Sequence, residues 1–509
     1  MERVFGPAAA ATFRHVQHCQ HRYGIRHWAA VLTSIPPHSA ARGQIYRTLT
    51  TKKEHQKAAR KTRFAPRAAY QPTSASTWII SDGSVSADKE AIALAKALSL
   101  PWVIKRVEWR QGLQWLPVPF KKLIMDYHHV VNRKQTDKRP WFMKGELLTA
   151  PYPNYVIGSG AKTLPGLLQV SRMSGRASFS AHIHFPALPF IHFDQVFLQR
   201  HEVVVQLAGL GLMKDQKNYF RINSTLNSIT SKSLELAKTN ALEHGLLPKS
   251  FFADHSHKGS NSPIVTVLMG GPNEDCSHNT QRMVNRLERL VDVQNCRLLI
   301  TYSQRTAENT KLAIQKFQGR IQNEQRVFVY DPMKVQQPLQ QTSGSSPIQD
   351  SATLMTWANT PGPTGVVGFS KDCNPYEAML ALADKIVVTA DSVAMTNEAL
   401  ATGKPVYVLG GELARGKLKV FHRYLADQHA TRAFRPGRVP ITPLSSSRAP
   451  AGNDTADPLS YPGDHPPWNQ SLAGQGPAEA KRIAERLHVM REARIAGRRI
   501  PDHVAEATC

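Results

Sequence analysis

Cysteine is scarce in this sequence, and the few cysteines present are not paired. The 509 residues contain five, spread from Cys19 to Cys509 without a CxxC spacing. Zinc sites and disulfide scaffolds need recurring cysteine spacings, so this distribution excludes a disulfide-rich fold, and no metal site is expected. It also fits a reducing compartment.

Long hydrophobic runs are missing as well. The most apolar stretch, residues 196–213, is interrupted by Arg200, His201 and Glu202. A helix that spans a bilayer needs roughly 20 consecutive apolar residues, so no transmembrane segment is expected. No stretch resembles a secretory signal. We therefore expect a protein that is soluble or peripheral to a membrane.

Acidic residues are rare in the first 76 residues. This segment has 13 lysine or arginine residues and only two acids, Glu2 and Glu54. A basic, Ala- and Thr-rich opening with almost no acids is typical of a mitochondrial address, so residues 1–76 are predicted to be a disordered targeting leader and the location mitochondrial. The alternative is a disordered basic arm that lies on anionic lipid or has no role.

Basic side chains exceed acidic ones over the whole chain, 64 against 38, for a net charge of +26 at pH 7. Such a protein can bind nucleic acid or an anionic membrane surface, and charge alone does not distinguish the two. The sequence shows no combined aromatic and basic groove signature, so no nucleic-acid partner is expected.

After residue 76, short β-branched runs alternate with helical patterns. This alternation predicts an α/β fold of two Rossmann-like, doubly wound domains, residues 77–229 and 230–431. The other predicted segments are a flexible Gln-, Ser- and Pro-rich insertion at 336–351, a Pro-, Ser- and Gly-rich linker at 432–475, and a basic helix with its tail at 476–509. That helix is expected to pack on the body, with attachment to a membrane surface as the alternative.

The most complete unit lies between residues 386 and 409. A β-branched strand at 386–388 ends at Asp391 and Ser392, both good helix N-caps. A helix over about 393–402 and a second strand at 406–409 follow, so the two strands must pair in parallel. The backbone N–H groups at the start of that helix attract phosphate or another anion.

A glycine pair in the first domain invites comparison with the dinucleotide fingerprint. Gly158 and Gly160 follow a predicted strand, but Thr163 stands where the third glycine of GxGxxG belongs. A nicotinamide site is therefore not expected.

The candidate site lies at the carboxyl ends of the second domain's strands, where open parallel sheets bind ligands. Three strand ends carry groups suited to a diphosphate: glycines that allow close approach, hydroxyls, a guanidinium and a helix N-terminus. A carboxylate further along the last helix suits ribose hydroxyls. The candidate ligand-binding residues are Gly270, Gly271, Ser303, Arg305, Thr306, Ser392 and Glu398.

Each of these residues also has a purely structural interpretation. The glycines can serve only turns, Arg305 can be a solvated charge, Ser392 can be only a helix cap, and Glu398 can pair with Lys404. Taken singly, each residue fits the structural interpretation better, and their convergence on one sheet edge makes a shared site an equally good interpretation.

No catalytic residue can be chosen from the sequence. Asp82, His201 and Glu202 stand at predicted strand ends, but the sequence shows no partner for any of them.

Six stretches carry a resemblance to a known family: TWIISDG, YVIGSG, FDQVFLQRHE, VTVLMGGPNED, LLITYSQRT and NPYEAMLALADKIVVTADSVAMTNEALATGKPVYVL. They resemble the mitochondrial fission factor family named for elongated mitochondria in plants, which also has bacterial members. The resemblance covers about residues 77 to 430, and the last two motifs are specific.

The resemblance implies a GT-B-like fold, in which two Rossmann-like domains face a central cleft. In glycosyltransferases of that fold, a glutamate on the helix after the switch-point turn holds the ribose of the nucleotide sugar. By resemblance this role would fall on Glu398, and Ser392 and Val393 would face the diphosphate. Plant members are implicated in mitochondrial division, as partners that bring a dynamin-related GTPase to the organelle. Val85 and Lys89 depart from the family, which usually has a glycine and a glutamine at these places.

Three hypotheses follow. The preferred one is a fission-family protein whose GT-B-like body acts through protein partners at mitochondria. The second is a metal-independent glycosyltransferase with a UDP- or GDP-sugar donor, in which Arg305 and a helix N-terminus neutralise the leaving diphosphate and no cofactor is required. The third is a scaffold whose cleft is vestigial. A leader that directs the chain into the matrix conflicts with the recruitment of a dynamin-related GTPase.

Overall fold

The computed structural model describes residues 75–131, 139–208, 218–248, 251, 262–294, 296–321, 326–332, 374–436, 457, 459–460 and 465–496. All of them belong to the compact unit Arg67–Cys509. The predicted leader, apart from its last two residues, and the predicted insertion at 336–351 lie outside the described residues.

The first domain is built on a seven-stranded sheet with the order β3-β2-β1-β4-β5-β6-β7. Every pairing is parallel except that of β2 with β3. Strands β1, β4, β5 and β6 are buried along their whole length, as expected for a parallel sheet covered by helices. The strands are β1 (Thr77–Ser81), β2 (Trp102–Trp109), β3 (Met143–Gly145), β4 (Tyr155–Ser159), β5 (Phe179–Ile183), β6 (Gln195–Gln199) and β7 (Tyr219–Ile222). The helical elements are α6 (Val85–Ala97), α7 (Val118–Val131), η2 (Ala161–Thr163), α8 (Leu164–Met173), η3 (Phe190–His192), α9 (Arg200–Glu202) and the π-helical η4 (Val203–Leu207).

The second domain has a six-stranded, wholly parallel sheet with the order β10-β9-β8-β11-β12-β13. Its strands are β8 (Ile264–Met269), β9 (Arg297–Tyr302), β10 (Val327–Tyr330), β11 (Lys385–Thr389), β12 (Val406–Leu409) and β13 (Thr431–Ala433). Its helical elements are α10 (Ser231–Glu243), α11 (Thr280–Gln294), α12 (Glu308–Arg320), α14 (Tyr376–Leu382), α15 (Val393–Ala401), η10 (Gly411–Leu413) and α16 (Gly416–Asp427).

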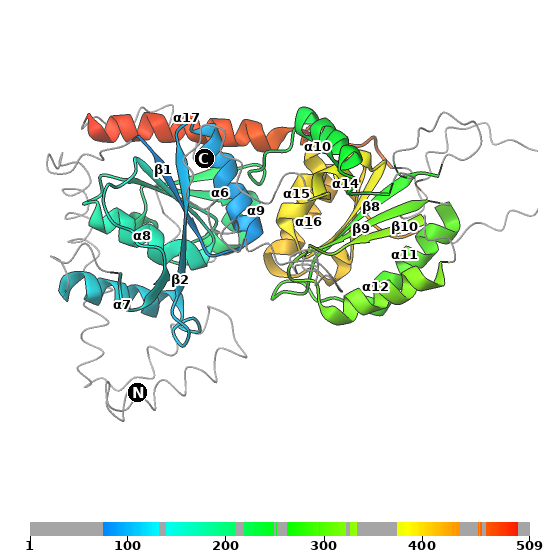
Figure 1. The fold of residues 1–509 in the computed structure, drawn as a ribbon, viewed down its shortest axis with the longest axis horizontal. Helices are drawn as coiled ribbons and strands as arrows, with labels where there is room; N and C mark the ends of the chain where they lie inside the picture. The colour runs from blue at the N-terminus through cyan, green and yellow to red at the C-terminus, as the bar shows by residue number, and fades with distance from the viewer. Residues whose placement is uncertain are drawn as a thin grey trace, which may run out of the picture. The chain divides into compact units, whose positions relative to one another are not determined.

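The predicted fold class is confirmed, since both domains are doubly wound α/β units of the GT-B type (Figure 1). The strand order reverses between β1 and β4 in the first sheet and between β8 and β11 in the second. Open α/β sheets bind ligands at such switch points, outside the carboxyl ends of the strands.

The predicted strand–helix–strand unit forms β11, α15 and β12, each within one residue of the expected bounds. Ser392 is the N-cap of α15, because its side-chain oxygen accepts a hydrogen bond from the N–H of Met395 at 3.3 Å. Thr402 ends the helix and Gly403 follows with a φ of +73°.

The C-terminal helix α17 (Gln475–Ile495) packs on the first domain (Figure 1). Its apolar residues Ile483, Leu487 and Met490 are buried in the same core cluster as the β4, β5 and β6 side chains. Arg494 pairs with Asp194 at 2.8 Å. The apolar side of this basic helix is therefore covered by its own domain.

Residues beyond β13 contact the second domain. Leu459 and Trp468 pack on its core cluster, and the Asp457 carboxylate accepts a hydrogen bond from the Tyr407 hydroxyl at 3.0 Å. These residues belong to the segment 432–475 that was predicted as a linker. Residues 437–456 of that segment lie outside the described residues.

Candidate functional site

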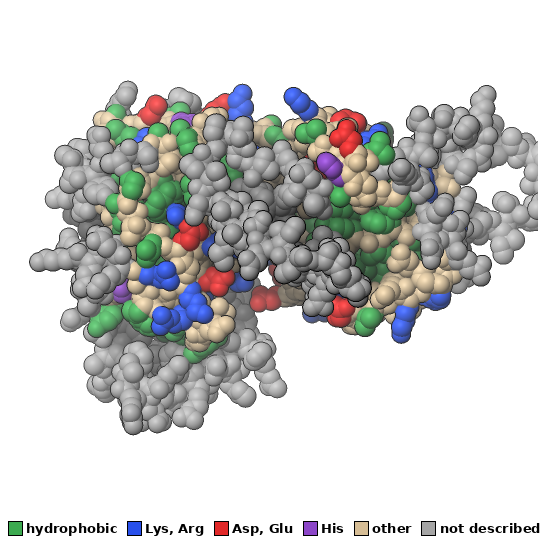
Figure 2. All heavy atoms as spheres, viewed as in Figure 1, with side chains coloured by type: hydrophobic (Ala, Val, Ile, Leu, Met, Phe, Trp, Pro, Cys, Tyr) green, Lys and Arg blue, Asp and Glu red, His purple; other side chains and the backbone are tan. Residues whose placement is uncertain are grey.

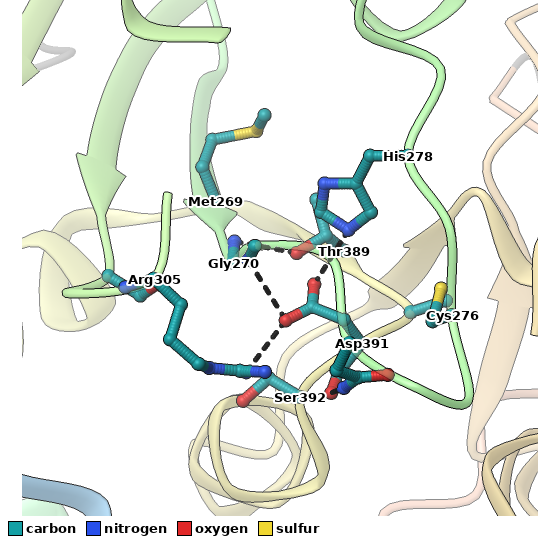
Figure 3. Close-up of polar contacts among 12 residues, drawn as sticks. Met269, Gly270, Cys276, His278, Arg305, Thr389, Asp391 and Ser392 are labelled. Atoms are coloured by element: carbon teal, nitrogen blue, oxygen red, sulfur yellow. Dashed lines mark hydrogen bonds and ion pairs between the residues drawn. The ribbon is translucent and has the colours of Figure 1, made fainter. Parts of the chain in front are cut away.

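A buried carboxylate, Asp391, lies at the switch point of the second sheet (Figure 3). It follows β11 and its side chain is fully buried. The Asp391 carboxylate accepts hydrogen bonds from the Gly271 N–H at 3.1 Å and the His278 Nε2 at 3.1 Å, and it pairs with the Arg305 guanidinium at 2.8 Å. Sequence analysis considered Asp391 only as a helix cap, and so missed the group on which the site is centred.

The two glycines admit Asp391 and Arg305 because they have no side chains. A Cβ on Gly270 would stand 2.1 Å from the Asp391 carboxylate, and one on Gly271 would stand 1.8 Å from the Arg305 carbonyl oxygen. The Gly270 N–H also donates to the Thr389 hydroxyl at 2.7 Å. Both predicted glycines thus lie where the segments after β8, β9 and β11 pass close to one another.

The predicted hydroxyls shape the loop that carries Arg305. The Ser303 N–H donates to the Thr306 hydroxyl at 2.9 Å, and that hydroxyl donates to the carbonyl of Met269 at the end of β8 at 2.9 Å. Ser303 and Thr306 therefore fix the turn after β9 against β8. This turn brings Arg305 to Asp391, and the hydroxyls of Ser303 and Thr306 form their hydrogen bonds within the turn and with Met269.

Glu398 belongs to a different set of contacts, between the two domains. Its carboxylate pairs with Lys89 of α6 at 2.9 Å and accepts a hydrogen bond from the Tyr376 hydroxyl. The Lys89 ammonium also lies 4.4 Å from the centre of the Tyr376 ring. The considered pairing of Glu398 with Lys404 is wrong, because the Lys404 ammonium donates to backbone carbonyls of α14.

The contact of Lys89 with Glu398 joins the two helices that follow β1 and β11. Lys89 stands on α6, the helix after β1, and Glu398 stands on α15, the helix after β11. A ribose that approached Glu398 would therefore have to displace the ammonium of Lys89, whose side chain is 42% exposed.

A second polar cluster lies at the carboxyl edge of the first sheet. The His184 imidazole, directly after β5, contacts Glu90 of α6 at 2.7 Å through Nε2 and Glu202 of α9 at 3.1 Å through Nδ1. The Ser159 hydroxyl at the end of β4 donates to Glu90 at 2.8 Å. Sequence analysis named Glu202 without a partner and missed Glu90 and His184. His184 directly follows β5, a strand that the sequence analysis did not predict, so no signal in the sequence pointed to this residue.

The two glutamates of the His184 cluster are buried, and the His184 backbone is strained. The two glutamate side chains are 4% exposed and that of His184 is 27% exposed. His184 has a φ of +75°, a backbone conformation that few side-chain-bearing residues adopt and that recurs at functional sites. Burial would lower the pKa of His184, but the two carboxylates raise it well above the ordinary value. Burial would raise the pKa of Glu202, but His184 holds it at about 2.

The other two candidate bases have different roles. The Asp82 carboxylate accepts a hydrogen bond from the Ser84 N–H at 3.1 Å and so closes the turn before α6. Burial lowers the pKa of His201 to about 4, so it is a neutral residue at pH 7. The His201 ring lies edge-on to Phe421 of α16 at 5.2 Å and helps join the two domains.

No group of three or more His, Cys, Asp or Glu side chains suited to a metal ion is found among the described residues. Within the same part of the chain, no helix has the length and apolar character needed to cross a bilayer.

Comparison with known proteins identifies relatives of this chain. The family model described as mitochondrial fission ELM1 matches residues 87–342 and 341–457. The mitochondrial fission protein ELM1 of Arabidopsis thaliana is 24% identical over 424 residues, which cover 74% of this chain and 88% of that protein. An uncharacterized protein of Rickettsia prowazekii (strain Madrid E) is 22% identical over 373 residues, which cover 70% of this chain and 90% of that protein.

Solved structures show a likeness at low sequence identity. The Staphylococcus aureus MnaA–UDP structure has a TM-score of 0.38 and 12% identity, and the match covers 85% of this chain and 94% of that one. The Neisseria meningitidis UDP-GlcNAc 2-epimerase bound to UDP-GlcNAc has a TM-score of 0.38 and 10% identity, with 86% and 97% covered. The Escherichia coli ADP-heptose LPS heptosyltransferase II has a TM-score of 0.31 and 12% identity, with 82% and 98% covered.

Proposed function

The chain belongs to the mitochondrial fission ELM1 family, and from this membership we propose that it acts in mitochondrial division or organisation through protein partners. The proposed partner is a dynamin-related GTPase or another division protein that the chain brings to the organelle. The proposed location is mitochondrial, with residues 1–76 as the targeting segment. In this proposal the two-domain body is a binding platform.

The internal pairing of the candidate site's charged groups carries this proposal. Arg305 is paired with Asp391, and Glu398 is paired with Lys89. Each contact occupies a residue that the nucleotide hypothesis needs: Arg305 for the diphosphate and Glu398 for the ribose. A body whose site groups bind one another is suited to a platform that keeps one shape while partners bind its surface.

The partner role can be tested in cells that lack the endogenous protein. We expect the wild-type chain to restore the normal mitochondrial length distribution. We expect Arg305→Ala to restore it equally at equal protein level, because a platform needs no guanidinium for a ligand and the Asp391 carboxylate keeps its hydrogen bonds from Gly271 and His278. The control is Arg320→Ala, which removes another exposed, ion-paired arginine of the same domain. A failure of Arg305→Ala alone, at equal protein level, would contradict the platform role and favour the enzyme.

The alternative function is a metal-independent glycosyltransferase with a nucleotide-sugar donor. One observation favours it: Gly270, Gly271, Arg305 and the N-terminus of α15 at Ser392 lie together at the switch point of the second sheet. This is the place at which open α/β sheets bind nucleotides, and N–H groups and a guanidinium suit a diphosphate. In this function a diphosphate competes with Asp391 for Arg305.

Thermal unfolding with UDP, GDP and their sugars tests this alternative. A ligand at 100 times its Kd stabilises the native state by about 2.7 kcal/mol, which is a measurable rise in Tm. If the site binds a diphosphate, Arg305→Ala should abolish the rise and Asp391→Asn should enlarge it, because the amide releases the guanidinium. No rise with any of these ligands would remove the enzyme hypothesis and leave the platform.

A further inference from the structure

Exposed hydrophobic side chains are concentrated in one part of the first domain. Of the ten large hydrophobic side chains that are exposed among the described residues, five lie between positions 115 and 147, on α7 and on the segments that flank it. These five are Trp115 (43% exposed), Leu123 (52%), Tyr127 (71%), Trp141 (53%) and Leu147 (48%). Single exposed hydrophobics need no explanation, but a concentration of this kind marks an interaction surface.

Ring contacts place Trp141, and the neighbour of Tyr127, against one pair of buried rings. The buried rings of Trp109 and Phe142 stack at 5.2 Å. Trp141 packs edge-on against Phe142 at 5.8 Å, and so does His128, the neighbour of Tyr127, at 5.4 Å.

The remaining two members are tied to the same rings. The Lys121 ammonium lies 5.4 Å from the centre of the Trp109 ring and donates to the carbonyl of Gln114, next to Trp115, at 2.8 Å. Leu123 precedes Tyr127 by one helical turn on α7 and so shares its face. We call Trp115, Leu123, Tyr127 and Trp141 the α7 patch.

Basic side chains border the α7 patch. The described residues between 101 and 150 include seven lysine or arginine residues and three acidic ones. Arg110, Arg139 and Lys144 are exposed, and each lies within three residues of Trp109 or Trp141. The Arg110 N–H donates to the Phe142 carbonyl at 3.0 Å, which places Arg110 beside the patch. Figure 2 shows lysine and arginine side chains gathered near hydrophobic ones over this part of the first domain, around β2 and α7.

We propose that the α7 patch docks the protein on the surface of an anionic membrane. Trp and Tyr rings favour the headgroup level of a bilayer, a leucine side chain enters the acyl boundary, and flanking Lys and Arg side chains attract anionic lipid. The opposite side of α7 is anchored in the first domain by the buried Met125, so the helix presents its outer face from a rigid body. Leu123 and Tyr127 favour a lipid surface over nucleic acid, which would need stacking rings and phosphate contacts without an aliphatic insertion.

This inference goes beyond the proposed function and does not depend on it, because it concerns lipid and needs no protein partner. It also differs from the membrane attachment considered for the C-terminal helix, whose apolar side is buried in the first domain.

Vesicle flotation with the purified full-length chain tests the proposal. We expect binding to phosphatidylcholine vesicles that contain about one third phosphatidylserine, and at least about tenfold weaker binding to phosphatidylcholine alone. The variant Leu123→Ser/Tyr127→Ser should bind the anionic vesicles at least about tenfold more weakly than the wild type. Leu236→Ser/Leu312→Ser is the matched control, because both leucines are 51% exposed on helices of the second domain. It should bind like the wild type.

A charge series completes the test. Arg110→Gln/Lys144→Gln should weaken binding to the anionic vesicles by at least about tenfold, while Arg289→Gln/Lys316→Gln, which removes the same charge from exposed positions of the second domain, should not. Equal binding by the wild type and both patch variants would overturn the proposal and assign the lipid contact to the basic leader. A loss of self-association in the patch variants, with vesicle binding unchanged, would also overturn it, because the patch would then hold a second copy of the chain.

Discussion

Replacement of Gly271 by alanine is expected to lower the free energy of unfolding by about 3 kcal/mol or more. The new Cβ would stand 1.8 Å from the carbonyl oxygen and 2.4 Å from the carbonyl carbon of Arg305. Both are backbone atoms, so the turn after β9 must move as a whole. That movement would separate Arg305 from Asp391, which now lie 2.8 Å apart. Urea unfolding followed by circular dichroism measures the loss.

Gly319→Ala is the matched control for this prediction. Gly319 lies in α12 of the same domain, where an added Cβ meets no atom within 4 Å. Alanine has a higher helix propensity than glycine, so this variant should be more stable than the wild type by up to about 1 kcal/mol. If Gly271→Ala unfolds at the same urea concentration as the wild type, the close approach that defines the candidate site is not present in the native protein.

Removal of the His184 side chain should destabilise the first domain by about 3 to 5 kcal/mol. His184→Ala leaves the Glu90 and Glu202 carboxylates, each 4% exposed, without the cation that they share. Introducing Glu90→Gln into this variant should restore part of the stability, because an amide needs no counter-ion and can keep the hydrogen bond with Ser159. Calorimetric unfolding of the single and double variants gives the comparison.

His429→Ala is the control for His184→Ala. It measures the effect of replacing a histidine of positive φ that forms no buried ion pair with the described residues. His429 also has a positive φ, +57°, but its side chain is exposed, so its removal should change stability by no more than about 0.5 kcal/mol. An equally small effect of His184→Ala would show that the cluster is not an ionised network in the folded protein.

The destabilisation by His184→Ala should also depend on pH. The pKa of His184 is raised above its ordinary 6.5, so its stabilising contribution is complete below pH 6.5 and is lost as the pH rises through the folded-state pKa. The pKa of Glu202 falls from 4.5 to about 2, so its contribution is complete above pH 4.5 and is lost as the pH falls toward 2. The difference in stability between wild type and variant should therefore be largest between pH 4.5 and 6.5. A difference that does not change with pH would contradict the ionic assignment.

The ends of the three strands that border the site could be predicted from local sequence. β-branched runs followed by small or polar residues gave β8, β9 and β11, and parallel pairing then required Gly271, Arg305 and Ser392 to lie near one edge. The cap role of Ser392 also followed from sequence, because an N-cap contacts its own helix three residues later.

The partners of the charged groups could not be predicted in this way. Arg305 and Asp391 are 86 residues apart, and Lys89 and Glu398 are 309 residues apart. Glu90, His184 and Glu202 come from three separate segments, and only the packing of α6 beside β4 and the pairing of β5 with β6 bring them together. No periodicity or spacing records contacts of this kind.

The sequence by itself determined the α/β class, the two domains, the ends of β8, β9 and β11 and the cap role of Ser392, because these depend on side chains within a few residues of one another. Only the tertiary structure decided that the Asp391 carboxylate binds the Arg305 guanidinium and the Gly271 N–H, two groups expected to hold a diphosphate. It also decided that Lys89 forms an ion pair with Glu398. The physical reason is that a charge in a buried site takes the nearest opposite charge in space, and that neighbour is set by sheet order and domain packing.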